Sequence, residues 1–123
     1  MRLWLDDVRE PWKHGYIGAE WAKTYDEAIA LLRTGEVSFA SLDHEIGACA
    51  DCTAAGYHIG DMKTAETTFY NKCPHAKTGY SVVCWMEENN VWPKDGVKVH
   101  SMNPVGRQRM QAVIDRHYRG RER

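Results

Sequence analysis

The 123-residue chain is long enough for one domain with one compact core. It is 43% hydrophobic and 27% charged, as soluble globular proteins are, and its net charge of −1 gives no general case for binding long nucleic acids. No apolar stretch approaches the roughly 18 residues of a membrane span, and the start MRLWLDD lacks the apolar core of a signal peptide. We therefore expect a single cytoplasmic domain with reduced cysteines.

The first half of the chain carries three strand patterns and one helix pattern. The predicted strands cover residues 2–5, 20–23 and 37–42. The predicted helix begins at Thr24, which forms a capping box with Glu27, and ends before Gly35. Residues 10–18 contain one proline and two glycines, so they are predicted to be a loop.

The second half alternates in the same way after a segment of different character. Residues 78–90 and 103–118 are predicted helices, and residues 97–101 form the strand between them. Asn103 can cap the last helix and Pro104 occupies its first position, an arrangement typical of a helix start. Strands that alternate with helices predict an α/β fold, in which helices flank a parallel sheet.

Polar side chains follow three of the predicted strands at the point where each strand ends. They are Asp6, Asp7 and Arg9 after the first strand, Asp43 and His44 after the third, and His100 and Ser101 after the last. In an open parallel sheet the carboxyl ends of the strands share one edge, and ligands bind there. The sequence therefore predicts one site that these residues share.

The start of the last helix indicates that the ligand is an anion. Free backbone N–H groups and the helix dipole attract negative charge to a helix N-terminus. Ser101 and Asn103 lie at this helix start, and the guanidinium of Arg107, within the first turn, fits phosphate oxygens. Together with Arg9, these residues form the predicted phosphate-binding set.

Two imidazoles beside a phosphate indicate a particular reaction. Opening a cyclic phosphodiester needs a base that activates water and an acid that protonates the leaving oxygen, and His44 and His100 can fill these roles. Asp7 and Asp43 complete the predicted catalytic set by orienting the histidines or by holding a metal. The competing use of the acids is a Mg²⁺ site at Asp6, Asp7 and Asp43, because Mg²⁺ prefers oxygen ligands.

Residues 47–77 have little apolar periodicity and hold three of the four cysteines, which indicates an insertion. Its predicted zinc ligands are Cys49, Cys52, Cys73 and His75, with His58 as a spare candidate. Four protein ligands fill every position of a tetrahedral zinc, so the ion would be structural and would fold a segment that has no core of its own. The alternative is a loop whose reduced cysteines bind nothing.

Four motifs in this order, LWLDDVR, SLDHEIG, TGY and VHSMNPVGRQRM, resemble those of the cyclic-phosphate-processing receiver-like domains. The resemblance covers nearly the whole chain and implies a receiver-like α/β fold that acts on cyclic phosphate ends. The cysteine-rich insertion is also similar to one that many members carry. Glu45 and Ile46 depart from the family pattern, which more often has Asp and Leu at these positions.

The resemblance also implies which receiver features are kept. Receiver domains place acids after the first strand and a phosphoacceptor Asp after the third, and Asp6, Asp7 and Asp43 stand at matching positions. The Lys that receivers carry after the last strand is absent, because His100 and Ser101 stand there. This loss argues against phosphorelay signalling.

The sequence thus predicts a phosphoesterase that opens or processes a cyclic phosphate by histidine acid–base catalysis. A cyclic phosphate-ended RNA, an ADP-ribose cyclic phosphate and a cyclic nucleotide all fit as substrates. The alternative is a non-catalytic module that binds and sequesters a cyclic nucleotide or another phosphorylated ligand, because binding and catalysis would use the same donors.

Overall fold

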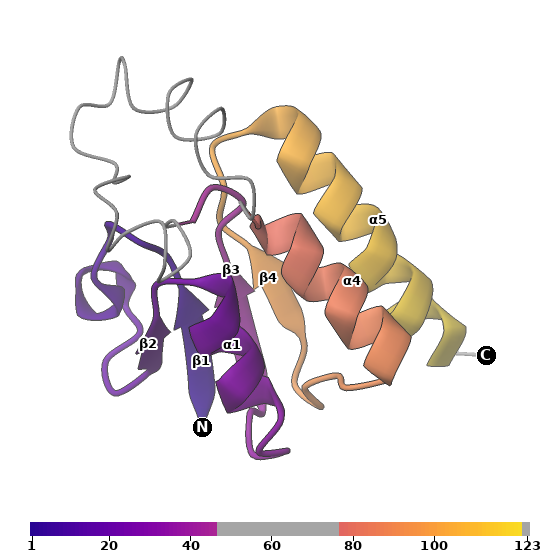
Figure 1. Ribbon diagram of the computed structural model, residues 1–123, viewed down its shortest axis with the longest axis horizontal. Helices are drawn as coiled ribbons and strands as arrows, with labels where there is room; N and C mark the ends of the chain where they lie inside the picture. The colour runs from indigo at the N-terminus through magenta and orange to yellow at the C-terminus, as the bar shows by residue number, and fades with distance from the viewer. Residues whose placement is uncertain (47–76, 122–123) are drawn as a thin grey trace.

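Four parallel strands form one sheet in the computed structural model, which describes residues 1–46 and 77–121 (Figure 1). The strands are β1 (Arg2–Leu5), β2 (Glu20–Ala22), β3 (Phe39–Leu42) and β4 (Val97–Val99). Their order across the sheet is β2–β1–β3–β4, so β1 and β3 lie at its centre. This confirms the predicted parallel α/β sheet, and the order agrees with a receiver-like arrangement.

Three α-helices pack against this sheet within the described residues. They are α1 (Tyr25–Leu32), α4 (Gly79–Asn89) and α5 (Pro104–Arg121). Figure 1 shows α1 and α4 side by side over the sheet, with α5 packed against α4 near β4. Thr24 caps α1 as predicted, because its side chain accepts a hydrogen bond from the Glu27 N–H (3.2 Å). No helix in the described part of the chain is long and apolar enough to cross a membrane.

The apolar core lies between the sheet and the helices. Each strand contributes the side chains of one alternating set, and each helix contributes one face. The buried members are Leu3, Leu5, Ala22, Ala40, Leu42 and Val99 from the strands and Ala28, Ile29, Leu32, Val82, Val83, Met86, Met110, Val113 and Ile114 from the helices. Each fully buried Leu or Val contributes roughly 1.5–3 kcal/mol relative to exposure, so this core fixes the strand ends that carry the polar residues.

The opposite face of the sheet is aromatic and polar. Trp4 is 2% exposed, and its ring lies 5.5 Å from that of His14 and 5.0 Å from that of Tyr16, both from the β1–β2 connection. This connection was predicted to be a loop, but it contains the short 3-10 helix η1 (Pro11–His14). Gly15 ends η1 with a φ of 87°, a left-handed conformation that favours glycine. The connection thus covers Trp4 on the second face of the sheet.

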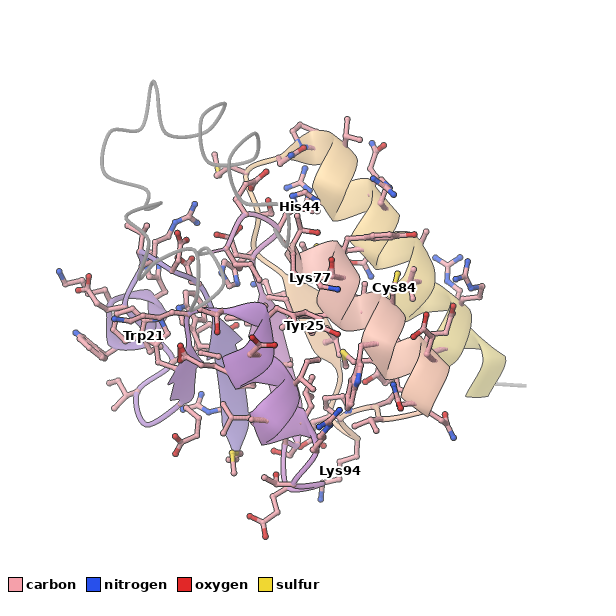
Figure 2. All side chains as sticks on the ribbon, in the orientation of Figure 1. Trp21, Tyr25, His44, Lys77, Cys84 and Lys94 are labelled. Atoms are coloured by element: carbon pink, nitrogen blue, oxygen red, sulfur yellow. The ribbon has the colours of Figure 1, made fainter. Side chains whose placement is uncertain are left out.

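The junction between β3 and α4 depends on a glycine. The Gly79 N–H donates to the His44 carbonyl oxygen (2.8 Å), and a Cβ at position 79 would lie 1.9 Å from the Asp43 carbonyl oxygen. A side chain there would collide with backbone, so the glycine of the TGY motif permits this approach. Figure 2 shows His44 at this end of the sheet, with Lys94 at the opposite end. The start of α4 is therefore held against the residues that follow β3.

Candidate functional site

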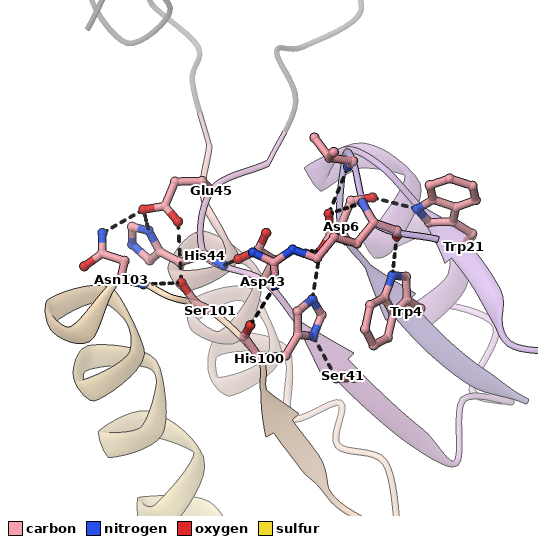
Figure 3. A network of polar contacts seen from close by, with 12 residues as sticks. Trp4, Asp6, Trp21, Ser41, Asp43, His44, Glu45, His100, Ser101 and Asn103 are labelled. Carbon is pink, nitrogen blue, oxygen red and sulfur yellow. Dashed lines mark hydrogen bonds and ion pairs between the residues drawn. The ribbon is translucent and has the colours of Figure 1, made fainter. Parts of the chain in front are cut away.

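The polar residues at the strand ends form two groups, which Figure 3 shows together. The His100 group consists of Trp4, Asp6, Ser41, Asp43 and His100. The His44 group consists of His44, Glu45, Ser101, Asn103 and Gly106. Alternation along the strands places the first group on the aromatic face of the sheet, whereas the second lies at the start of α5.

His100 is held at both ring nitrogens and on one ring face. Its Nε2 lies 3.1 Å from Asp6 Oδ2 and its Nδ1 lies 2.8 Å from Ser41 Oγ. The ring stacks on Trp4, with 4.1 Å between centroids and 5° between planes. Only 12% of the side chain is exposed. A ligand can therefore bond to a ring nitrogen of His100 only if the imidazole leaves Asp6 or Ser41.

Asp6 connects the members of the His100 group. Its Oδ1 accepts hydrogen bonds from the backbone N–H groups of Val8 (2.9 Å) and Arg9 (2.8 Å), and its Oδ2 faces His100. Burial raises the pKa of this carboxyl, but the hydrogen bonds from His100, Arg9 and Val8 outweigh burial and lower the pKa overall. Asp6 is therefore ionised at neutral pH.

Two neighbouring carboxyls shift in the opposite direction. Burial, followed by the negative charge of Asp6, raises the pKa of Asp43 to about 6, although Asp43 Oδ1 accepts a hydrogen bond from the His44 N–H (2.8 Å). Burial also raises the pKa of Asp7 to about 6, and the charges of Asp6 and Glu45 add to this increase. Both carboxyls thus keep a proton in a substantial fraction of molecules near pH 6.

His44 is held at one ring nitrogen. Its Nδ1 lies 3.1 Å from Glu45 Oε1, and the described residues contain no hydrogen bond to its Nε2. The ring packs directly on the first turn of α5, because a Cβ at Gly106 would lie 2.4 Å from His44 Cδ2 and 2.8 Å from Nε2. Glycine at position 106 therefore makes room for the imidazole. Nε2 is the nitrogen that His44 can offer to a ligand.

Glu45 joins the His44 group, although the sequence-based prediction did not include it. Its Oε1 accepts a hydrogen bond from Asn103 Nδ2 (2.7 Å) and contacts His44, and its Oε2 accepts one from Ser101 Oγ (3.4 Å). Burial raises the pKa of Glu45, but hydrogen bonds from Asn103 and His44 lower it overall, so the carboxylate is charged at neutral pH. The available sequence signal is its position directly after Asp43 and His44 in SLDHEIG.

Asn103 and Ser101, two predicted phosphate-binding residues, form hydrogen bonds within the protein. Asn103 caps α5 as predicted, because its Oδ1 accepts a hydrogen bond from the Gly106 N–H (3.0 Å). Ser101 is 2% exposed, and its Oγ accepts a hydrogen bond from the Asn103 N–H (3.1 Å). Both side chains therefore help to build the His44 group, whatever ligand they contact.

The two predicted phosphate-binding arginines flank the groups. Arg9 Nη1 donates to the His100 carbonyl oxygen (3.5 Å), and Arg9 Nε lies 3.8 Å from Asp6 Oδ2. Arg107 is exposed on the first turn of α5, and its side chain makes no hydrogen bond or ion pair with another described residue. The guanidinium of Arg107 therefore has no described protein partner, whereas that of Arg9, whose side chain is 38% exposed, already contacts Asp6 and His100.

Three ligand atoms of the His100 group lie close enough to share a metal ion. Carboxylate oxygens of Asp6 and Asp43 and a ring nitrogen of His100 all lie within 4.8 Å of one another. Asp7, which the sequence-based Mg²⁺ prediction includes, is outside this cluster, and His100 takes its place. The described residues do not include the predicted zinc ligands Cys49, Cys52, Cys73 and His75.

A family model for the cyclic-phosphate processing receiver domain matches residues 1–116. The chain belongs to this family. The matched range contains all four strands and both histidine groups, and it confirms the resemblance seen in the four motifs. Comparisons with curated proteins and with solved structures found no match.

The structure brings the ends of β1, β3 and β4 together, as the parallel sheet requires, but it divides the predicted catalytic histidines between two groups. Trp4 and Ser41 are site residues that the sequence-based prediction did not include. A signal for them exists, because each stands two residues before a predicted site residue, Asp6 or Asp43, and so lies on the same face of its strand.

Proposed function

We propose that this domain is a phosphoesterase that opens or processes a cyclic phosphate, carried by RNA ends, ADP-ribose or a cyclic nucleotide. The observation that carries the proposal is an imidazole at a helix N-terminus: Glu45 engages His44 through Nδ1, which leaves Nε2 for a reacting atom beside α5. The family description, which names cyclic-phosphate processing, supports the substrate chemistry.

The proposed reaction is hydrolysis of one P–O bond of the cyclic diester. His44 Nε2 takes a proton from a water molecule, whose oxygen attacks phosphorus as the bond to the leaving oxygen breaks. His100, the proposed acid, gives the leaving oxygen its proton, so the products are a phosphomonoester and a free hydroxyl group. One positioned proton-transfer group of this kind typically contributes roughly 10²–10⁴-fold in rate.

The two histidines would contribute in different ways. His44 can act in its observed position, whereas His100 must release Ser41 or Asp6 before one of its nitrogens reaches a leaving oxygen. Asp43 lies in the same cluster, and its pKa of about 6 lets it hold a proton close to His100. We therefore assign Asp43 to proton delivery with His100, and Asp7 keeps its sequence-based role of orienting the histidines or holding a metal.

The proposed phosphate clamp combines two arginines with the start of α5. Arg107 and Arg9 would bind the phosphate oxygens and stabilise the charge that develops in the transition state. Ser101 and Asn103 complete the clamp from the helix start. Because these two already bond within the His44 group, the arginines would provide most of the binding energy.

A specific observation favours the alternative of a binding module. Both nitrogens of His100 are bonded to protein groups, so the observed arrangement offers one free imidazole nitrogen where the reaction needs a base and an acid. A domain of this design would bind a cyclic nucleotide or another phosphorylated ligand through the same arginines and leave it unchanged.

A Mg²⁺ ion at the acidic residues is a further proposal. Asp6 and Asp43 would hold it through carboxylate oxygens, with Asp7 or His100 as the third ligand. When bound, such an ion would polarise a phosphoryl oxygen of the substrate. The buried carboxyl of Asp43, whose pKa is raised by burial and by Asp6, fits a position that a cation would stabilise.

A structural zinc ion in the segment 47–77 remains a proposal that its four-ligand pattern supports. Purified protein should then contain about one zinc per chain, and Cys52→Ser should lose the metal, because binding and local folding are one equilibrium. Elemental analysis that finds no metal in well-folded protein would contradict it.

The function is tested by incubating the protein with a panel of cyclic phosphates, with and without EDTA, and following phosphorus NMR. The proposal predicts a new phosphomonoester resonance that persists in EDTA. Turnover that EDTA abolishes and Mg²⁺ restores would replace the two-histidine mechanism with a metal-dependent one. Tight binding of a panel member without turnover would establish the binding module instead.

A further inference from the structure

We propose that Glu45 is a positioning residue, whose carboxylate selects the ring tautomer and orientation of His44 that present Nε2 to the substrate. The catalytic meaning of this assignment rests on the proposed function. The tautomer itself is a property of the unliganded protein, so it can be measured without any substrate.

Three donors converge on the Glu45 carboxylate. Asn103 Nδ2 lies 2.7 Å from Oε1, His44 Nδ1 lies 3.1 Å from the same oxygen, and Ser101 Oγ lies 3.4 Å from Oε2. A carboxylate can accept all of these hydrogen bonds, because each oxygen has two lone pairs. Glu45 is thus held by two residues of the α5 start while it contacts the imidazole.

The position of Asn103 makes this arrangement rigid. Its Oδ1 caps α5 by accepting the Gly106 N–H (3.0 Å), so its Nδ2 is directed towards Glu45 by the same side-chain conformation. The orientation of the Glu45 carboxylate is therefore coupled to the first turn of the helix. That helix start is also where the phosphate is proposed to bind.

An ionised carboxylate accepts hydrogen bonds and donates none, so the His44 nitrogen that faces it carries the proton. A neutral imidazole has one N–H, and a proton on Nδ1 leaves the lone pair on Nε2. That lone pair is what a general base requires. With the other tautomer, His44 would present a donor to the attacking water and could not take its proton.

Gly106 fixes the ring from a second side. A Cβ at this position would lie 2.4 Å from Cδ2 and 2.5 Å from Cγ of His44, so the ring occupies the space that any other residue would fill. Glu45 holds one ring nitrogen, and the bare backbone of α5 supports the ring itself. Together they restrict the rotation of His44 about its side-chain bonds.

The test compares Glu45→Gln with the native protein by nitrogen-15 NMR of the histidine rings, which distinguishes protonated from unprotonated ring nitrogens. Spectra are followed with increasing pH until they stop changing, and His44→Gln identifies the His44 signals. Glutamine keeps the size of the side chain but offers one acceptor oxygen to three donors. We expect His44 to be the Nδ1–H tautomer in native protein and a tautomer mixture in Glu45→Gln.

Turnover of the cyclic phosphate that proves to be a substrate provides the second readout. Glu45→Gln should lower kcat by at least about tenfold with little change in KM, because the arginines still bind the phosphate. Glu45→Asp, which keeps the charge on a shorter side chain, should restore part of the loss. Glu87→Gln is the matched control, since Glu87 pairs with Arg116 at an exposed position outside both groups.

An unchanged His44 tautomer in Glu45→Gln would overturn the proposal, whatever the activity. If no cyclic phosphate is turned over by native protein, the proposed function fails, while the NMR comparison still decides the role of Glu45. Gly106→Ala is a second variant, which keeps the His44 placement testable if Glu45→Gln does not fold. Alanine favours a helix over glycine by roughly 1 kcal/mol. Its methyl group must displace the His44 ring, because the new Cβ would lie 2.4 Å from His44 Cδ2. The variant should therefore move the His44 signals and lose activity, and unmoved signals would contradict the ring placement.

Discussion

The two histidine groups lie at the same edge of one sheet, yet they place their imidazoles in opposite situations. His100 is bonded at both nitrogens and stacked on Trp4, whereas His44 is bonded at Nδ1 and rests on the glycine backbone of α5. Alternation explains the difference. Asp43 and His100 face the aromatic side of the sheet with Trp4, and His44, one residue after Asp43, turns towards the helices.

The comparison shows that the environment of a histidine after a strand depends on the face of the sheet towards which its side chain points. On the aromatic face, Asp6 and Asp43 are both buried, and burial followed by the charge of Asp6 raises the pKa of Asp43. On the helix side, three donors converge on Glu45, and its charge is stabilised. The first environment favours holding a proton or a cation, and the second favours a defined imidazole tautomer.

The largest effects are expected when each histidine is replaced by alanine and both turnover and the free energy of unfolding are measured. His44→Ala should lower turnover by roughly 10²–10⁴-fold with a smaller loss of stability than His100→Ala, because one ring nitrogen and not two is bonded, and affinity for the phosphate should survive because Arg107 remains. His100→Ala should lower turnover as much and also cost roughly 2–4 kcal/mol of unfolding free energy, because it leaves Asp6 and Ser41 without their partner. Turnover kinetics and urea denaturation of both variants make this comparison.

Full activity in both variants would exclude the two-histidine mechanism and leave a metal held by the acids as the better account. A bell-shaped dependence of kcat on pH is expected for native protein, since one group must be unprotonated and the other protonated. Each variant should lose the limb that belongs to its missing histidine.

Asp43→Asn should stabilise the protein at neutral and alkaline pH. The folded-state pKa of Asp43 is about 6 against an ordinary value of 3.8, so the folded protein loses stability as pH rises from about 4 to about 6. Removing the charge should restore on the order of 2–3 kcal/mol at about pH 8 and change little at about pH 4. Denaturation of metal-free protein in EDTA across this range measures the difference.

The contribution of Asp6 to stability is expected to depend on pH in the opposite direction, so Asp6→Asn serves as the internal control. Its pKa is lowered on folding, so its contribution is present above the ordinary value and is lost as pH falls through the folded pKa. Asp6→Asn should therefore destabilise the protein at neutral pH. Equal stability of Asp43→Asn and native protein at about pH 8 would show that the ionised Asp43 carboxylate does not destabilise the folded protein.

Arg107→Ala should weaken binding and turnover alike, by about tenfold each, since a charge-assisted hydrogen bond contributes roughly 1.5 kcal/mol or more in both ground and transition states. Arg119→Ala is the matched control, because Arg119 lies on the same helix, is largely exposed and pairs with Asp115 (3.7 Å). Calorimetric titration with a cyclic phosphate compares the two. Equal affinities would remove Arg107 from the phosphate clamp.

The smallest expected effects test whether the two groups act independently. Ser41→Ala should cost about 1–2 kcal/mol, because it removes the partner of His100 Nδ1, and Ser101→Ala should cost about 1 kcal/mol through Asn103 and Glu45. The two costs should add within about 0.5 kcal/mol in the double variant. A larger coupling energy, measured by denaturation, would show that the groups form one network.

Periodicity and topology made much of this fold predictable from the sequence. Three of the strands were predicted because short apolar runs end in polar residues, and the start of α5 because Asn103 and Pro104 are typical of a helix start. The shared edge followed from parallel pairing alone. The family match over residues 1–116 confirms the resemblance on which the receiver-like interpretation rests.

The features of the site that could not be predicted from the sequence depend on contacts between segments that are distant in the chain. Glu45 belongs to the site because Asn103, 58 residues away in the sequence, donates a hydrogen bond to it. No local sequence pattern predicts that contact. Gly79 and Gly106 look like ordinary helix residues until the Asp43 carbonyl oxygen and the His44 ring occupy the space beside them. The proximity of His100 to Asp6 and Asp43 is likewise a contact in space between distant segments, which the sequence-based Mg²⁺ prediction did not include.

The hydrogen bond from Gly79 to the His44 carbonyl oxygen has a consequence for how this domain tolerates change in chain length. It joins the residues that follow β3 to the first residue of α4, so the two ends of the intervening sequence are fixed beside each other. The entropy of closing a chain segment between two fixed ends grows only with the logarithm of its length, and doubling the length costs about 0.6 kcal/mol. Insertions and deletions confined to residues 47–76, which leave Glu45 and the buried Ile46 unchanged, should therefore leave both imidazoles where they are.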